Sequence, residues 1–256
     1  MAHEASSFIW YELMTDDLAA TEAFYTSVVG WTVASSGMPG MDYRIWSAAG
    51  RGVGGLMAIP AEAAGMKPGW FGYLKVADTD ASVAGVVAAG GSVCKPAMDL
   101  PGVGRMAMLF DPQGASFYVM TPKMGEAAPP PVAPMQRGHG SWHELHTKDA
   151  RAALAFYSAE FGWGSAGEMD MGPMGTYLMF NTGGDPAGGM MTSAALGRPA
   201  WLFYFAVEDI DAAKARVEAA GGTVTNGPME VPGGDWIVQG LDPRGAAFAV
   251  VGSRKA

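Results

Sequence analysis

Residues 10–31 have the sequence WYELMTDDLAATEAFYTSVVGW, and residues 142–163 have the sequence WHELHTKDARAALAFYSAEFGW. The two segments share a leading Trp, a Phe-Tyr pair and a closing Gly-Trp pair, each 132 positions apart. Further along, an Asp-Pro pair beginning at Asp111 returns at Asp242, 131 positions later. Because the offset holds to within one residue over about a hundred positions, the chain contains two copies of one structural unit.

Each copy also repeats within itself, more faintly. Trp10 is matched by Trp70 after 60 residues, and Trp142 is matched by Trp201 after 59. The sequence therefore predicts four quarter-units of about 60 residues each.

A proline-rich segment separates the two copies. Residues 121–138 contain five prolines in eighteen positions, which disfavours a helix or a central strand. We therefore expect a first domain at residues 1–121, a linker at 122–139 and a second domain at 140–256.

Local patterns predict the secondary structure of one quarter-unit. Residues 8–14 alternate in the way of a strand, with Trp10, Glu12 and Met14 on one face. Asp16 and Asp17 suit the N-cap of a helix that the Phe-Tyr pair continues. Gly at position 30 ends the helix, and three further strands follow. The unit is βαβββ, and the fold class is α+β.

Composition limits the class of protein. Hydrophobic residues make up 49% and charged residues 16%, which indicates a folded chain. No apolar run reaches the roughly 18–20 residues of a membrane helix, and the first residues do not resemble a signal peptide. The net charge of −9 argues against nucleic acid as a partner. With a single cysteine, Cys94, a cytoplasmic protein without a disulfide framework is expected.

The motif FYxxxxGW at the end of the first helix and the motif DPxGAxF before the last strand each occur twice. This combination resembles the vicinal oxygen chelate superfamily, which includes glyoxalase I, bleomycin-resistance proteins and extradiol dioxygenases. The resemblance implies a tandem duplication of the glyoxalase/bleomycin-resistance/dihydroxybiphenyl dioxygenase-like fold. Four βαβββ modules would then form two cup-shaped mixed sheets.

Enzymes of this superfamily hold a divalent metal ion with His and Glu side chains from four strands of each cup. The corresponding segments on the fourth strands, 56–59 and 190–193, contain no such ligand. The remaining positions hold no His, Glu or Asp either; they are Trp10, Phe71, Tyr118, Trp142, Leu202 and Ala249. We therefore predict neither a metal site nor another cofactor.

An unusual site at residues 139–146, which contain three of the four histidines, is an alternative. On a strand Glu144 and His146 share one face, while His143 points to the other. The pair could reach one Zn, Ni, Mn or Fe ion only with ligands from elsewhere. A solvated or hydrogen-bonded histidine pair is the simpler interpretation.

Polar chemistry is expected at the two matched glutamates. Glu12 and Glu144 occupy equivalent first-strand positions, where a carboxylate is costly unless it is paired. Either Arg44, Arg105 or backbone N–H groups satisfy it, or it anchors or deprotonates a ligand. The candidate catalytic residues are Glu12, Glu144 and His146.

Aromatic and methionine side chains are the candidate walls of a ligand site, because such sites are mostly apolar. The candidates are Trp10, Met14, Tyr43, Trp46, Phe71, Tyr73, Tyr118, Trp142, Tyr177, Met190 and Tyr204. The leading hypothesis is a metal-free protein that binds a small, largely apolar or aromatic organic molecule. The alternatives are a metal-dependent lyase, isomerase or dioxygenase that uses Glu144 and His146, and a scaffold or signalling protein with filled cups. A monomer is expected, with a homodimer as the alternative.

Overall fold

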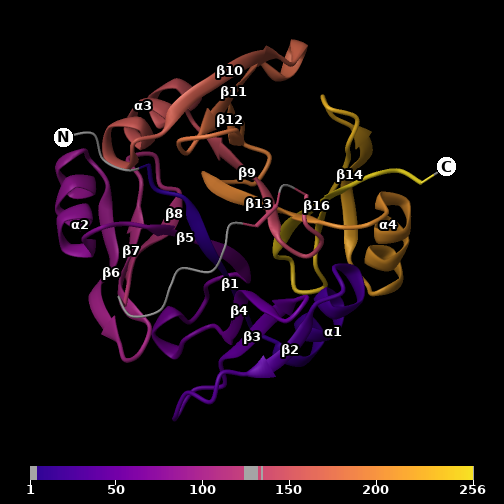
Figure 1. The fold of residues 1–256 in the computed structure, drawn as a ribbon, viewed down its shortest axis with the longest axis horizontal. Coiled ribbons are helices and arrows are strands. Elements are labelled where there is room, and N and C mark those ends of the chain that lie inside the picture. The colour runs from indigo at the N-terminus through magenta and orange to yellow at the C-terminus, as the bar shows by residue number, and fades with distance from the viewer. Residues whose placement is uncertain (1–4, 124–131, 134, 256) are drawn as a thin grey trace. The chain divides into compact units, whose positions relative to one another are not determined.

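The computed structural model describes residues 5–123, 132–133 and 135–255. The expected order of strand, helix and three strands occurs four times along the chain (Figure 1). Parts of the predicted linker, at residues 124–131 and 134, lie outside the described residues.

The four repeats follow one another in sequence. The first consists of β1 (Phe8–Thr15), α1 (Leu18–Val28), β2 (Thr32–Ser35), β3 (Arg44–Ala48) and β4 (Arg51–Ala58). The second consists of β5 (Gly69–Lys75), α2 (Thr79–Ala88), β6 (Ser92–Leu100), β7 (Gly104–Phe110) and β8 (Ser116–Pro122). The third consists of β9 (Gly140–Thr147), α3 (Ala150–Phe161), β10 (Gly164–Asp170), β11 (Thr176–Asn181) and β12 (Pro186–Thr192). The fourth consists of β13 (Ala200–Ala206), α4 (Ile210–Ala219), β14 (Thr223–Glu230), β15 (Trp236–Leu241) and β16 (Ala247–Gly252).

The strands form two eight-stranded sheets with matching order. One sheet runs β2-β3-β4-β1-β5-β8-β7-β6, and the other runs β10-β11-β12-β9-β13-β16-β15-β14. Both are mixed: β1 pairs with β4 in parallel, whereas β3 pairs with β4 in antiparallel. The predicted α+β class and the two mixed sheets are confirmed.

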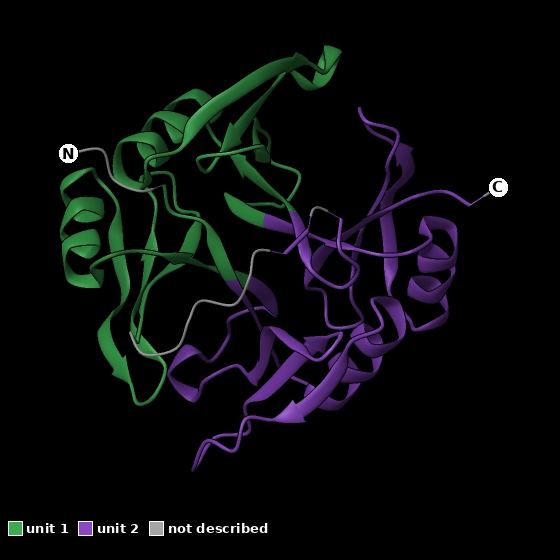
Figure 2. Ribbon diagram, in the orientation of Figure 1, with its two compact units in different colours: residues 1–9, 71–130, 142–201 green, residues 10–70, 131–141, 202–256 purple. Residues whose placement is uncertain are grey.

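By packing, the chain divides into two compact units, drawn in green and purple in Figure 2. Unit 1 consists of Met1–Ile9, Phe71–Pro130 and Trp142–Trp201. Unit 2 consists of Trp10–Trp70, Pro131–Ser141 and Leu202–Ala256. Each unit thus combines one repeat from each half of the sequence. The domain boundaries predicted near residues 121 and 140 follow the sequence repeat and stay a prediction.

An aspartate caps each of the four α-helices among the described residues. The side chain of Asp17 accepts a hydrogen bond from the backbone N–H of Ala20 at 3.0 Å, as predicted for the first helix. Asp78, Asp149 and Asp209 cap the other helices in the same way. Such a cap satisfies a backbone N–H that has no partner within the helix. Among the described residues, no helix has the length and apolar character needed to cross a membrane.

The core of unit 2 is organised around Tyr25 of α1. Its hydroxyl accepts a hydrogen bond from Trp70 Nε1 at 2.9 Å and donates one to Asp242 Oδ2 at 3.3 Å. Trp31 packs against the Tyr25 ring and donates its indole N–H to the carbonyl of Gly138 at 2.7 Å. The repeated Tyr, Trp and Asp of the sequence motifs are therefore partners in one buried network.

Unit 1 contains the same network. Tyr157 of α3 accepts a hydrogen bond from Trp201 Nε1 at 3.2 Å and donates one to Asp111 Oδ2 at 3.3 Å. Trp163 stacks on Tyr157 and donates to the carbonyl of Ser6 at 2.7 Å. Burial raises the pKa of both Tyr157 and Asp111. The repeated sequence motifs thus form the same buried hydrogen-bond network in each unit.

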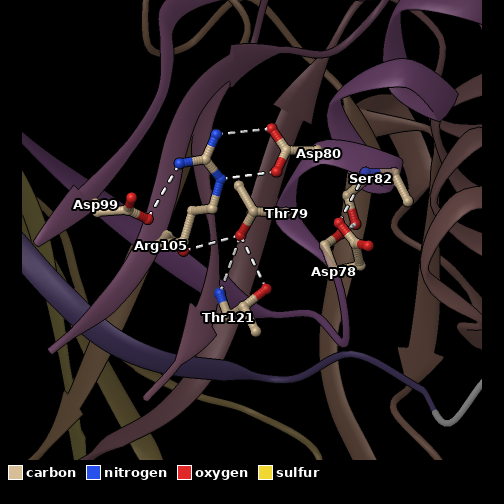
Figure 3. Close-up of polar contacts among 8 residues, drawn as sticks. Asp78, Thr79, Asp80, Ser82, Asp99, Arg105 and Thr121 are labelled. Carbon is tan, nitrogen blue, oxygen red and sulfur yellow. Dashed lines mark hydrogen bonds and ion pairs between the residues drawn. The ribbon is translucent and has the colours of Figure 1, made fainter.

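Both arginines expected beside the glutamates pair with other carboxylates. Figure 3 shows Arg105 of β7 donating to both oxygens of Asp80, at 2.7 and 2.9 Å, and to Asp99 Oδ1 at 3.0 Å. Thr79, at the start of α2, donates to the carbonyl of Arg105 at 2.8 Å. This network ties the N-terminus of α2 to the sheet.

Arg44 of β3 pairs with Glu22 at 2.7 Å and with Asp42 at 2.8 Å. Arg44 and Arg105 were two of the possible partners that the sequence offered for Glu12 and Glu144, and neither arginine takes that role. Each arginine lies partly exposed among surface carboxylates, so its guanidinium group stays hydrated. Pairing with the buried Glu12 or Glu144 would remove that hydration.

Candidate functional site

Strand β9 carries Glu144 and His146 on one face, as its alternation predicts. His146 Nε2 lies 2.8 Å from Glu144 Oε1, so the two side chains form a hydrogen-bonded pair. Glu144 is 7% exposed and His146 is 5% exposed, whereas Trp142 on the same face is partly exposed. The face therefore changes from aromatic and partly exposed to polar and buried along the strand.

Tyr177 of β11 completes this arrangement. Its hydroxyl donates to Glu144 Oε2 at 3.0 Å and accepts from Trp142 Nε1 at 2.7 Å. We call Trp142, Glu144, His146 and Tyr177 the β9 cluster. All four members belong to unit 1. The cluster joins two predicted ligand-binding residues to two predicted catalytic residues.

A glycine makes the cluster possible. Strand β12 lies between β9 and β11, and its Gly189 is in register with Glu144. A side chain at Gly189 would overlap the ring of Tyr177. The absence of that side chain lets the tyrosine ring cross β12 and reach Glu144.

The hydrogen bonds define the direction of each donor. Because Trp142 donates to the Tyr177 oxygen, the tyrosine hydrogen is directed to Glu144. A carboxylate only accepts, so His146 donates through Nε2, and in the neutral imidazole the lone pair is then on Nδ1. Nδ1 is buried and has no hydrogen-bond partner among the described residues.

The first copy repeats the framework without the histidine. Trp10 Nε1 donates to the Tyr43 hydroxyl at 2.9 Å, and a side chain at Gly55 would overlap the Tyr43 ring. Gly55 is in register with Glu12, which is 4% exposed. Met14 takes the position that His146 has in the second copy. These residues belong to unit 2.

The remaining predicted residues lie elsewhere. Tyr73 and Tyr118 are in register and stack at 4.2 Å between ring centroids, with Phe71 at 6.3 Å from Tyr118. Tyr204 accepts a hydrogen bond from Gln239 Nε2 at 2.6 Å.

Two of the predicted ligand-binding residues, Trp46 and Met190, have no exposed surface at all. Trp46 is fully buried beside Tyr25 and Trp31. Met190 is fully buried and in register with Leu145, so it lies on the face opposite Glu144 and His146. The structure therefore places Trp46 apart from Trp10 and Tyr43, and Met190 apart from the β9 cluster.

Sequence reasoning missed three residues beside these positions. Met191, and not Met190, is in register with both His146 and Tyr177. Gly189 accommodates Tyr177, and Gln239 bonds Tyr204. Once the register of β12 with β9 is known, strand alternation identifies Met191 as the residue beside His146. The sequence alone does not give that register.

The other described histidines are separate from the cluster. His143 stacks on Phe8 at 4.6 Å and donates through Nδ1 to the carbonyl of Ala187 at 2.7 Å. Burial lowers the pKa of His143 to about 4, so it is neutral near pH 7. Nδ1 of His139 lies 3.1 Å from the carbonyl of Arg137, and His139 belongs to unit 2. The histidine-rich segment is therefore not one site.

A hollow of about 360 Å³ lies near the start of α3, within unit 1. Its lining includes Arg151, Met174 and Thr192. A second hollow of similar volume, within unit 2, has Arg137 and Glu208 in its lining. Neither hollow is lined by a residue that the sequence predicted for ligand binding.

A family model described as the Glyoxalase/Bleomycin resistance protein/Dioxygenase superfamily matches residues 7–119 and again residues 141–250. The chain belongs to this superfamily. Similar superfamily proteins include "Putative glyoxylase CFP32" of Mycobacterium tuberculosis, which is 35% identical over 246 residues, 94% of this chain and 93% of the relative. "Anthracycline biosynthesis protein DnrV" of Streptomyces peucetius is 35% identical over 262 residues, 96% of this chain and 93% of the relative.

Solved structures of the superfamily share the fold. The Mn(II)-bound glyoxalase from Novosphingobium aromaticivorans superimposes with a TM-score of 0.70 at 17% identity, covering 99% of this chain and 84% of that chain. The 2,3-dioxygenase LapB from Pseudomonas sp. KL28 gives a TM-score of 0.67 at 13% identity, covering 100% of this chain and 94% of that chain. At these identities the likeness concerns the fold alone.

The metal that the superfamily implies does not fit the side chains of this chain. The first-strand position is a tryptophan in both copies, and each indole N–H already donates to a tyrosine. Trp, Tyr and Phe offer none of the ligand atoms that divalent metals prefer. Across residues 5–123, 132–133 and 135–255, no three His, Cys, Asp or Glu side chains are grouped to hold an ion.

Proposed function

We propose that this superfamily member binds a small, largely apolar or aromatic organic molecule at the β9 cluster, without a metal held by the protein. The observation that carries the proposal is the combination of a partly exposed Trp142 with a buried, hydrogen-bonded pair of Glu144 and His146. Ligand sites typically combine apolar walls with a few placed polar groups that fix the orientation of the ligand. The β9 cluster offers both elements within one hydrogen-bonded group.

The relatives support an aromatic ligand. Two Streptomyces relatives, each 34–35% identical over more than nine-tenths of the chain, are named for anthracycline biosynthesis. Anthracyclines are polycyclic aromatic compounds, and a flat aromatic molecule suits stacking on an indole such as that of Trp142. The mycobacterial relatives carry the name "Putative glyoxylase", which agrees with an oxygenated molecule as the ligand.

The alternative is a metal-dependent lyase, isomerase or dioxygenase that uses Glu144 and His146. The observation in its favour is that the solved structures sharing this fold include a Mn(II)-bound glyoxalase and several dioxygenases. Under this alternative, Glu144 and His146 would exchange their mutual hydrogen bond for Zn, Ni, Mn or Fe. A scaffold without a ligand is the remaining alternative.

Titration with alizarin, a planar dihydroxylated anthraquinone, tests the proposal. In buffer with EDTA we expect alizarin to quench the tryptophan fluorescence of the full chain in a saturable manner. Trp142→Phe should weaken binding, whereas Trp236→Phe should not, because Trp236 is a partly exposed tryptophan outside the cluster that packs on Arg254. Absence of saturable quenching would contradict the proposal.

Elemental analysis and native mass spectrometry of protein purified without added metal separate the alternatives. We expect less than stoichiometric Zn, Ni, Mn and Fe, and a mass near 26.6 kDa for a monomer, with any retained small molecule as an added mass. Stoichiometric metal would favour the metal-dependent enzyme. A mass twice as large would favour a homodimer.

A further inference from the structure

We infer that Nδ1 of His146 takes the proton of an acidic hydroxyl group on the bound molecule, so that the second copy acts on the ligand and the first does not. This inference rests on the proposed function, and it names the chemistry of the ligand as a hydroxylated aromatic molecule. His146 is the proton acceptor, and Glu144 and Tyr177 are positioning residues.

The first step concerns the orientation of the imidazole. Tyr177 and His146 donate to different oxygens of Glu144, at 3.0 and 2.8 Å. Trp142 holds the tyrosine hydroxyl through a further bond of 2.7 Å. With three side chains fixed in one chain of hydrogen bonds, the ring of His146 has a defined orientation and tautomer.

The second step concerns the unsatisfied atom. Nδ1 of His146 is buried without a partner among the described residues, and the side chain as a whole is only 6% exposed. Buried polar atoms nearly always have a partner, and one without a partner costs stability. A ligand hydroxyl supplies the missing donor, whereas an apolar atom there leaves the atom unsatisfied.

The third step concerns the charge. When the ligand O–H bond breaks, an N–H bond forms at Nδ1 and the electron pair stays on the ligand oxygen as a phenolate or enolate. The imidazolium that results keeps its Nε2 hydrogen bond to Glu144, and an adjacent carboxylate stabilises an imidazolium. Protons and charges balance without any further reactant.

The fourth step concerns the difference between the two copies. The Trp, Tyr, Glu and Gly positions are retained in the first copy as Trp10, Tyr43, Glu12 and Gly55. The histidine position is Met14, whose thioether does not accept a proton near pH 7. The framework is thus common to both copies, and the proton acceptor occurs in one.

Alizarin is a suitable probe, because ionisation of its hydroxyl shifts its visible absorption to longer wavelength. Anthraquinone, which has the same three rings and no hydroxyl, is the matched control ligand. The experiment uses the full chain in buffer with EDTA at a pH where free alizarin is protonated. We expect bound alizarin to show the absorption of its anion and anthraquinone to bind about tenfold more weakly.

Three variants locate the acceptor. His146→Gln keeps an amide donor for Glu144 but cannot take a proton, and it should bind alizarin without the spectral shift. Glu144→Gln should reduce the shift, because the imidazolium loses its carboxylate. Glu62→Gln, at an exposed position outside the cluster, is the control for the same chemical change and should leave the shift unchanged. Melting temperatures within a few degrees of the parent protein show that each variant is folded.

The outcomes separate the inference from the proposed function. If alizarin binds but its spectrum stays that of the neutral form, or if the shift persists in His146→Gln, the inference is overturned and the binding proposal stands. If neither alizarin nor anthraquinone binds the parent protein, both are overturned. If His146→Gln does not fold, loss of the shift in Glu144→Gln but not in Glu62→Gln supports the inference, and an unchanged shift in Glu144→Gln overturns it.

Discussion

The hydroxyl of Tyr157 donates a hydrogen bond of 3.3 Å to Oδ2 of Asp111, while Oδ1 of the same carboxylate accepts from three backbone N–H groups of the following turn. Asp111 is 3% exposed, and burial raises its pKa. The residue therefore works mainly as a hydrogen-bond acceptor, and a negative charge on it is costly. Asp242 and Tyr25 repeat the arrangement in unit 2.

Two replacements of Asp111 distinguish the contribution of its acceptor oxygens to stability from that of its negative charge. Asp111→Ala leaves buried N–H groups without a partner and should lower the free energy of unfolding by about 3 kcal/mol. Asp111→Asn keeps the acceptor oxygen and should cost less than about 1 kcal/mol. Urea denaturation measures both, with the exposed Asp185→Asn as the control. Equal losses for Ala and Asn would show that the charge is essential.

The motifs could be located from the sequence, but their partners could not. The repeated Phe-Tyr and Asp-Pro pairs correctly predicted two copies, each with two βαβββ units. However, Tyr25 bonds Asp242 of the other copy and not Asp111 of its own. Repetition identifies equivalent positions, whereas the choice between partners depends on which repeats pack together, and packing joins repeats from different halves of the chain.

The candidate site could be predicted to a similar extent. Strand alternation placed Glu144 and His146 on one face, and in the structure the two side chains form a hydrogen bond. The contribution of Tyr177 depends on the pairing of β11 with β12 and on the small size of Gly189. A glycine in a strand indicates a close approach, but only the fold identifies the side chain that approaches.

The role of Gly189 leads to a second prediction. In Gly189→Ala the new methyl group would occupy the place of the Tyr177 ring, so the tyrosine must leave Glu144. We expect a loss of about 1–3 kcal/mol in the free energy of unfolding, together with weaker binding of alizarin. Gly184→Ala is the matched control, because nothing lies within 4 Å of a side chain at that position. Equal thermal melts for the two variants would contradict this role.

His143 leads to a prediction about pH. Its pKa in the folded protein is lowered to about 4 from the ordinary value of 6.5, so between these values the unfolded chain binds more protons than the folded chain. The contribution of neutral His143 to stability is therefore complete above pH 6.5 and is lost as the pH falls toward 4. We expect a loss of about 2 kcal/mol over this range, allowing for partial exposure of the ring.

Urea denaturation from pH 7 to pH 4 measures this loss. His143→Asn retains a donor for the carbonyl of Ala187 and does not titrate, so its stability should vary less with pH than that of the parent protein. Parallel pH profiles for the two proteins would show that His143 is not the titrating group.

The central claim, that His146 presents an unprotonated Nδ1 to the ligand, is tested most directly by long-range proton–nitrogen correlation NMR of the histidine side chains. The signal of His146 is assigned by its loss in His146→Gln. We expect a proton on Nε2 and none on Nδ1 in the free protein, followed by protonation of Nδ1 when alizarin is added to saturation. A free protein with the proton on Nδ1, or a saturated complex in which Nδ1 stays unprotonated, would contradict the claim.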